Sequence, residues 1–199
     1  MARRRLLSFL FLLLCVAAFA GFVALGVWQV QRLAWKEDLI ARVDARVHAA
    51  PVTAPAPGDW ASVSKDVHEY RRVQLTGEYR VDGLSLVAAA TEEGQGYWVM
   101  VPLQRADGSR VYINRGFVPQ RLREQAARGD FTPRGQVSVT GLLRLNQPGG
   151  GVLRDNVPTE NRWYSRDVQA MAELHGLAPV APYFVDAEAS TQPGPIGGL

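Results

Sequence analysis

The side chains best suited to metal binding or covalent catalysis are few in this 199-residue sequence, and they stand far apart. His48, His68 and His175 each lack a second histidine at the spacing of a metal site. The single cysteine, Cys15, lies within an apolar run, and there is no Gly-x-Ser-x-Gly elbow. Residues 149–151 are three glycines without the Lys-Ser/Thr pair that a phosphate loop requires. We therefore predict no catalytic residue and no metal site.

The distribution of charge argues against a nucleic-acid partner. The formal net charge is +3, from 22 Lys plus Arg and 19 Asp plus Glu. Three arginines at positions 3–5 account for the excess, so the other 19 basic residues balance the 19 acidic ones. A neutral body offers no basic face for contacts with phosphates. We therefore expect no nucleic acid among the partners.

The first apolar run predicts a transmembrane helix. Residues 6–28 carry no charge, and as a helix they would measure about 35 Å, against about 30 Å for the hydrocarbon core of a bilayer. The arginines at 3–5 precede this run and the flank after it mixes both signs, which places residues 1–5 in the cytoplasm. The alternative is a signal peptide cleaved after Ala20, which would release a secreted enzyme.

Helical spacing continues beyond the membrane segment. Apolar residues keep a helical period over residues 29–50, which predicts an extension of the anchor helix. Trp28, Arg32 and Trp35 recur at i, i+4 and i+7 and therefore share one helix face. An arginine between two indoles is typical of an aromatic belt at the level of the lipid headgroups, and a face that docks a partner is the alternative.

The remaining sequence predicts three parts. Prolines at positions 51, 55 and 57 predict a stiff linker over residues 51–66. A β-rich extracytoplasmic domain is expected over residues 67–188, followed by a Pro/Gly-rich tail over residues 189–199. We predict an α+β fold class in which the transmembrane helix precedes a mainly antiparallel β domain, either a small barrel or a sheet, with short helices.

Local patterns place the elements of this domain. Runs rich in Val, Tyr and Leu predict strands at residues 70–79, 84–89, 97–103, 110–118, 137–145 and 183–187. An Asp-Gly turn between the third and fourth runs predicts an antiparallel hairpin. Short helices are expected at residues 120–127 and at residues 168–175, the second capped by Asp167.

Four blocks of the sequence together resemble the surfeit locus protein 1 family, membrane factors that assist the assembly of haem-copper cytochrome c oxidase. The blocks are LGVWQVQRLAW at residues 25–35, EYRRVQLTGEY at 69–79, YINRGFVP at 112–119 and NRWYSRDVQAMA at 161–172, and PGPIGGL ends the sequence. In this order and spacing they cover most of residues 25–199.

The resemblance implies a set of contact residues. The family's Gly-x-Trp-Gln-x-x-Arg pattern and its Asn-Arg-Gly block fall on the candidates Trp28, Gln29, Arg32, Asn114, Arg115 and Gly116. These residues would contact a partner or a haem propionate, and Arg115 would clamp a carboxylate. For Gly116 a purely structural role is the alternative, because a glycine permits a bend in a strand.

The resemblance also implies a function. It points to a non-enzymatic assembly factor that acts at the delivery of haem a, with the oxidase core subunit and a haem a synthase as partners besides the lipid bilayer. We expect no cofactor bound by this chain itself. Family members usually continue into a second membrane helix that carries a haem-associated histidine, and we expect a C-terminally short version that lacks it.

The expected location is a bacterial inner membrane. The five residues before the apolar run leave no room for a mitochondrial transit peptide. The N-terminus would lie in the cytoplasm and the main domain in the periplasm. The alternative to an assembly factor is a single-anchor periplasmic ligand-binding or sensing module.

Overall fold

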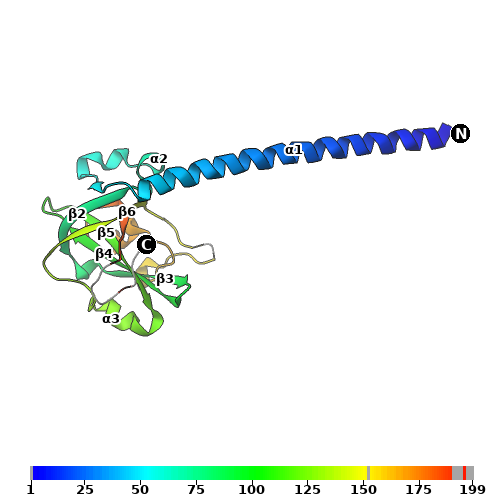
Figure 1. The fold of residues 1–199 in the computed structure, drawn as a ribbon. Coiled ribbons are helices and arrows are strands. Elements are labelled where there is room, and N and C mark those ends of the chain that lie inside the picture. The colour runs from blue at the N-terminus through cyan, green and yellow to red at the C-terminus, as the bar shows by residue number, and fades with distance from the viewer. Residues whose placement is uncertain (1, 152, 190–194, 196–199) are drawn as a thin grey trace. The chain divides into compact units, whose positions relative to one another are not determined.

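The structure is a computed structural model that describes residues 2–151, 153–189 and 195 of the chain. Internal contacts divide the chain into two compact units, Met1–Ala45 and Arg46–Leu199. The first unit is helical and the second contains all the strands (Figure 1).

A single long helix makes up the first unit. The helix α1 (Ala2–Val47) contains no proline and ends four residues before Pro51, a residue type that disfavours helical backbone at the position before it. The part Phe9–Val47 is long and apolar enough to cross a membrane, and the Leu, Phe and Trp side chains along it are exposed. Its 39 residues measure about 58 Å, nearly twice the thickness of a hydrocarbon core. The helix therefore runs on through the extension that its periodicity predicts.

Five strands of the second unit close into a ring. In ring order they are β2 (Arg72–Tyr79), β6 (Gln136–Leu145), β7 (Val180–Ala187), β5 (Arg110–Pro119) and β4 (Gly94–Gln104). The ring closes where β4 returns to β2, through the pairs Glu78–Gln104 and Tyr79–Leu103. Every pairing in the ring is antiparallel except that of β5 with β7. The domain is therefore a small barrel, and the predicted α+β class is confirmed.

The connectivity of this barrel is that of the OB-fold, a five-stranded Greek-key barrel. If the ring strands are numbered along the chain, they follow the order 1-4-5-3-2 around the ring, and strand 3 lies parallel to strand 5. The connection from strand 3 to strand 4 holds the short helices η3 (Gln120–Leu122) and α3 (Arg123–Ala127). OB-folds bind ligands on the face of strands 2 and 3, between the loop from strand 1 to 2 and the loop from strand 4 to 5.

These two ligand-binding loops are long here and carry elements of their own. The first, residues 80–93, holds η2 (Val81–Gly83) and the strand β3 (Ser85–Thr91), which pairs antiparallel with β4. The second, residues 146–179, holds η4 (Pro158–Glu160) and the helix α4 (Val168–Leu174). The carboxylate of Asp167 accepts a hydrogen bond from the N–H of Ala170, which confirms the predicted cap.

Residues 51–66, which their composition predicts to be a linker, are instead folded onto the barrel. The strand β1 (Val52–Thr53) pairs in parallel with β2, and Ala54 after it is 2% exposed. The helices η1 (Pro57–Ser62) and α2 (Lys65–His68) follow. The prediction was wrong because proline fixes a φ that suits a short edge strand as well as an extended linker.

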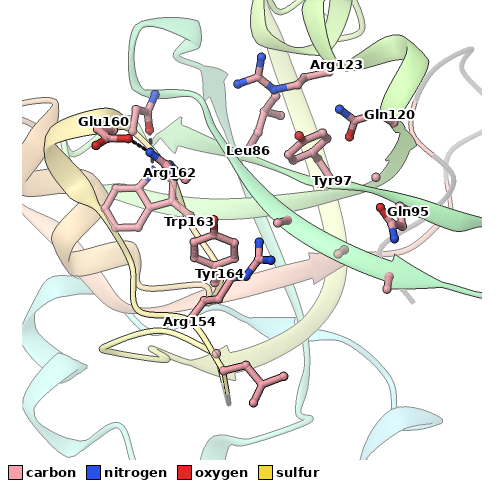
Figure 2. A pocket seen from close by; sticks show the side chains of 17 residues that line it. Leu86, Gln95, Tyr97, Gln120, Arg123, Arg154, Glu160, Arg162, Trp163 and Tyr164 are labelled. Atoms are coloured by element: carbon pink, nitrogen blue, oxygen red, sulfur yellow. Dashed lines mark hydrogen bonds and ion pairs between the residues drawn. The ribbon is translucent and has the colours of Figure 1, made fainter.

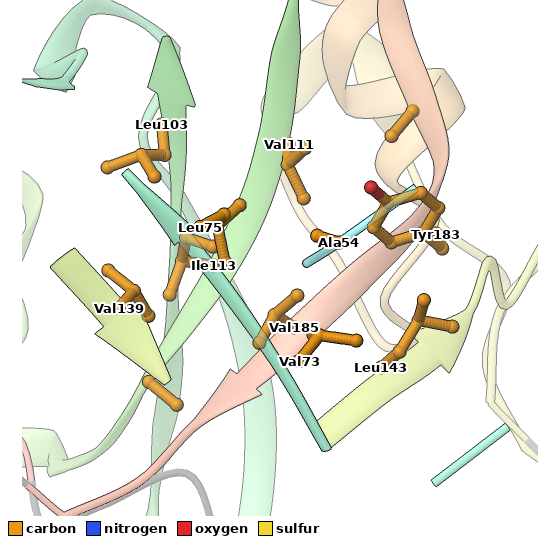
Figure 3. Close-up of a cluster of buried hydrophobic side chains, with 12 residues drawn as sticks. Ala54, Val73, Leu75, Leu103, Val111, Ile113, Val139, Leu143, Tyr183 and Val185 are labelled. Carbon is orange, nitrogen blue, oxygen red and sulfur yellow. The ribbon is translucent and has the colours of Figure 1, made fainter. Parts of the chain in front are cut away.

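The interior of the barrel is a closed apolar core to which all five ring strands contribute (Figure 3). Its buried members are Ala54, Val73, Leu75, Leu103, Val111, Ile113, Val139, Leu143, Ala181, Tyr183, Val185 and Ala187. Alternate residues of β5 and β7 point inward, as the two-residue period of a strand requires. The residues between them, such as Tyr112 and Phe184, join a second cluster with Met171 of α4 on the outer face. Helix α4 thus covers one side of the barrel.

Candidate functional site

The Asn-Arg-Gly run of residues 114–116 lies at a β-bulge. One residue of β4 faces two residues of β5 here, Arg115 and Gly116. Gly116 has a φ of +119°, in the region that favours glycine. The side chain of Asn114 is buried, and its Oδ1 accepts the N–H of Gly116 at 3.1 Å. Gly116 thus permits the bend at this bulge, and both Asn114 and Gly116 are buried; contact with a partner stays a prediction for them.

Asp186 is the centre of a buried polar cluster and is 2% exposed. Its carboxylate accepts hydrogen bonds from Asn114 Nδ2 at 2.7 Å, Arg144 Nη1 at 3.0 Å and Arg166 Nη1 at 3.2 Å. Glu69 supplies a second carboxylate, which accepts from Arg144 Nε at 2.9 Å. Two carboxylates thus face two guanidinium groups, so the charges of the cluster balance. Such a cluster holds several segments together, because removal of one partner leaves a buried charge unpaired.

The two arginines of this cluster differ in their electrostatic environment. Burial lowers the pKa of Arg166 more than the charge of Asp186 raises it. The pKa of Arg144 is raised despite its burial, because Arg144 has a hydrogen bond to Glu69 as well as the charge of Asp186. Both guanidinium groups also lie over aromatic rings, Arg144 over Tyr70 at 4.5 Å and Arg166 over Phe184 at 4.8 Å.

The cluster brings together three of the four blocks that carry the family resemblance. Glu69 belongs to the block at residues 69–79, Asn114 to the block at 112–119 and Arg166 to the block at 161–172. These blocks are far apart in the sequence and meet at a strand, β7, that belongs to none of them. Part of the sequence pattern behind the resemblance therefore encodes a buried polar cluster on the outer face of the barrel.

The side chain of Arg115 makes two contacts within the domain, with Phe131 and with Tyr79. Its guanidinium donates to the carbonyl of Phe131 and lies over the ring of Tyr79 at 5.2 Å, and burial lowers the pKa of Arg115. Burial likewise raises the pKa of the Tyr79 hydroxyl. Among the residues that the structure describes, no carboxylate forms an ion pair with Arg115. The carboxylate clamp proposed for Arg115 stays a prediction.

The other three candidates lie on α1, in the first unit. The guanidinium of Arg32 lies 5.3 Å from the ring centre of Trp28, which agrees with their spacing of four residues. Trp28 is 50% exposed, and the side chain of Gln29 is also exposed. Contact with a partner stays a prediction for Trp28, Gln29 and Arg32.

A groove of about 940 Å³ is lined by residues of both long loops, of β4 and of the segment that holds η3 and α3 (Figure 2). Its floor is one face of the β3–β4 pair. The pairs Ala88–Tyr97 and Ala90–Gln95 place these four side chains on the same face, together with Leu86. The alanine side chains are small, so they leave open space above the floor along β3. The larger ring of Tyr97 projects from β4.

Two walls flank this floor, and each carries an arginine whose guanidinium lies over a tyrosine ring (Figure 2). On the wall formed by η3 and α3, the guanidinium of Arg123 lies 5.6 Å from the ring centre of Tyr97. On the opposite wall, formed by the loop between β6 and β7, the guanidinium of Arg154 lies 5.5 Å from the ring centre of Tyr164. Stacking orients a planar guanidinium and leaves its N–H edge available to a ligand.

The groove is electropositive. Three arginines and one glutamate line it, and the glutamate, Glu160, forms an ion pair with Arg162. Among the described residues, neither Arg123 nor Arg154 has a carboxylate at ion-pair distance. A hydrogen bond from Arg154, aided by Arg162, lowers the pKa of the Tyr164 hydroxyl. The groove therefore favours an anionic ligand.

A buried hydrogen-bond network fixes the wall that carries Tyr164. Trp163 is 1% exposed, and its carbonyl accepts the N–H of Ala88 at 2.9 Å. Its indole N–H donates to Asn161 Oδ1 at 2.6 Å, and Asn161 has a φ of +47°, which asparagine tolerates. The same oxygen accepts the hydroxyl of Ser85 at 3.3 Å, and His175 Nε2 lies 3.3 Å from that hydroxyl. This histidine therefore packs in the fold, where burial lowers its pKa.

Sequence reasoning missed both the groove and the cluster around Asp186. The cluster had a signal, because Asp186 is an acidic residue within the otherwise apolar strand β7, and such a residue needs a buried partner. The groove had a partial signal, because four residues of the block at 161–172 line it: Asn161, Arg162, Trp163 and Tyr164. Its two other arginines had none. Arg123 and Arg154 lie 31 residues apart in polar loops, and only the fold brings them to one surface.

Fold and site together define a class of protein. It has an N-terminal helix long and apolar enough to cross a membrane, and a small barrel with a binding groove between its loops. The chain belongs to the SURF1 family, whose model matches residues 16–197. It is 35% identical to Surfeit locus protein 1 of Homo sapiens over 96% of this chain and 67% of the human protein.

Other relatives show the same extent of similarity. Surfeit locus protein 1 of Mus musculus is 36% identical over 94% of this chain and 64% of the mouse protein. The protein of the same name from Takifugu rubripes is 34% identical over 94% of this chain and 82% of its own length. The chain thus spans about two thirds of the length of the human and mouse proteins.

Proposed function

We propose that this protein is a membrane-anchored assembly factor for haem-copper cytochrome c oxidase that acts at the stage of haem a delivery. It acts without catalysis, by holding the oxidase core subunit and a haem a synthase near each other. It resides in a bacterial inner membrane, with the N-terminus in the cytoplasm and the barrel in the periplasm.

The observation that carries this proposal is the match to the SURF1 family over residues 16–197, which includes the larger part of α1 and the barrel. The apolar part of α1 supports a membrane location, and the arginines at positions 3–5 support the orientation. The groove supports a role in binding, because its walls hold polar groups in place without a nucleophile beside them.

Haem a is cargo in this proposal, and the histidines of the barrel domain do not form a site for it. His68 Nδ1 accepts the N–H of Ser64 at 3.2 Å, and His175 Nε2 lies beside Ser85. Neither histidine lines the groove. The proposal therefore gives this chain the task of positioning the proteins that exchange haem a, and no axial ligand is assigned to it.

Deletion of the gene tests the proposal. Membranes of the deletion strain should lose cytochrome c oxidase activity and haem a, and the 199-residue chain supplied on a plasmid should restore both. The haem b content of the same membranes is the control, because a general loss of respiratory membrane would lower both haems. Unchanged oxidase activity and haem a after deletion would refute the proposal.

The groove favours a second candidate, a periplasmic module that binds or senses a ligand on a single anchor. It is lined in part by the two long loops of an OB-type barrel, the loops with which such barrels bind ligands. This candidate predicts that deletion leaves haem a unchanged. It also predicts that the purified full chain is stabilised by an anionic ligand, and a thermal shift with that ligand would measure the effect.

A further inference from the structure

The strand β3 leaves part of its outer edge unpaired, beside the floor of the groove. Successive residues of a strand point their N–H and C=O groups to opposite edges. The N–H of Ala88 points outward, where it donates to the carbonyl of Trp163. The C=O of Ala88 and both backbone groups of Ala90 must point the same way. Among the residues that the structure describes, no strand pairs with β3 at these positions.

These free groups form a pattern that a polypeptide backbone matches. They follow one another as acceptor, donor and acceptor, and a strand laid alongside β3 would offer the complementary order. A fully deprotonated anion such as sulfate has no donor for the two carbonyl groups, so it would leave them without partners. An open strand edge is a ready template for one more strand.

The side chains around this edge indicate the composition of that strand. The floor carries small side chains at Ala88 and Ala90, so the side chains of a bound segment have room above it. Arg123 and Arg154 stand on the opposite walls, each with its guanidinium over a tyrosine ring and without a carboxylate of its own among the described residues. A guanidinium binds a carboxylate through two parallel hydrogen bonds, so acidic side chains match both walls.

We propose that the groove binds an extended acidic segment of a partner protein, which adds as a strand to the outer edge of β3 and pairs its carboxylates with Arg123 and Arg154. This inference rests on the proposed function, because it describes the surface with which an assembly factor would hold the protein that it assembles. The partner segment is recognised by its negative charge and its extended backbone.

Binding of model peptides to the full chain in detergent micelles tests the role of charge. The probe is a fluorescein-labelled octapeptide of alternating glutamate and valine, and its counterpart carries lysine in place of glutamate. Fluorescence anisotropy should detect binding of the acidic peptide alone, and the affinity should fall as salt is raised. Equal binding of both peptides, or of neither, would overturn the inference.

Charge reversal locates the peptide in the groove. The double variant Arg123→Glu/Arg154→Glu should raise the Kd of the acidic peptide at least about tenfold, because like charges then face each other. Arg121→Glu is the matched control: Arg121 is exposed on the same short helical segment but does not line the groove. It should change the Kd less than about twofold. Equal effects of the double variant and the control would refute the location.

Two changes test strand addition. Ala90→Pro removes the outward N–H but leaves the ladder to β4 intact, because the N–H of Ala90 points away from β4. This variant should raise the Kd of the acidic peptide about tenfold and leave the binding of inorganic phosphate unchanged. A probe N-methylated at its central valine makes the same test on the unaltered protein. If the methylated and unmethylated probes bind equally, the groove is a site for small anions and the inference is wrong.

The deletion strain separates this inference from the proposed function. If oxidase activity is lost on deletion and the double variant restores it fully, the groove is not used in assembly; the inference fails and the proposed function stands. If deletion costs no oxidase activity, the proposed function fails, and peptide binding by the purified chain decides the inference alone.

Discussion

The charge balance around Asp186 makes a quantitative prediction. Asp186→Asn keeps the shape of the side chain but removes its charge, so Arg166 loses its only carboxylate in the described structure. Removing one partner of a buried ion pair costs about 3–5 kcal/mol. Arg144 keeps Glu69, and the side chains of both arginines are 18–19% exposed, so the lower end of this range applies. We expect the free energy of unfolding to fall by about 3 kcal/mol.

For a domain of this size, about 3 kcal/mol corresponds to a decrease in Tm of about 6–12 °C. The assay is thermal unfolding of the full chain in detergent, followed by the near-UV circular dichroism of buried aromatic rings, which α1 does not dominate. The matched control is Asp130→Asn. Asp130 pairs with Arg128 on the surface, where the side chains are 43% and 60% exposed, and such a pair contributes less than about 1 kcal/mol. If both variants melt within about 2 °C of the parent protein, the cluster does not hold the barrel together and the reasoning is wrong.

Three further predictions concern the barrel and its groove. Burial raises the pKa of Tyr183 to about 12, above its ordinary value of about 10. The neutral hydroxyl therefore contributes up to about 3 kcal/mol to the free energy of unfolding. This contribution is complete below about pH 10 and is lost as the pH rises toward 12. Tyr183→Phe should therefore flatten the decline of urea stability between about pH 9 and 12, and an unchanged slope would contradict the assignment. Gly116→Ala should lower the free energy of unfolding in urea by about 1–3 kcal/mol, because Gly116 has a positive φ. Gly58→Ala is the control: a Cβ there would meet open space, so the loss should be less than about 0.5 kcal/mol. Asn161→Ala should lower the free energy of unfolding by about 1–3 kcal/mol, because the buried indole N–H of Trp163 loses its acceptor. The fluorescence of Trp163 should also shift to the red. Unaltered emission and stability would argue against this network.

The sequence predicted the elements of the domain better than their arrangement. Residues 110–118 were expected as a strand and β5 is Arg110–Pro119; residues 137–145 were expected and β6 is Gln136–Leu145. The Asp-Gly turn also predicted correctly that β4 and β5 form a hairpin. These features depend on side chains a few residues apart, which periodicity and turn chemistry can detect.

Features that depend on distant residues were not predictable in this way. The ring closes through only two pairs between β2 and β4, and β5 pairs in parallel with a strand near the other end of the domain. Of the candidate contact residues, Asn114 turned out to be buried against Asp186, because the Asn-Arg-Gly motif says nothing about which strand lies opposite. The alanines of the groove floor also gave no signal in the sequence. They shape the groove only because their small side chains leave space beside a strand edge.

The place of β7 in the ring determines when the domain can fold. β7 is the last strand among the residues that the structure describes, yet it lies between β5 and β6, and Arg110 pairs with Val180 at a sequence separation of 70. Contacts of such high sequence separation make folding slow. A chain that is being exported through a membrane would therefore expose the open edges of β5 and β6 until its final strand emerges. During that interval it would be open to proteolysis or to protection by a chaperone, so the yield of folded protein would depend on the rate at which the chain emerges.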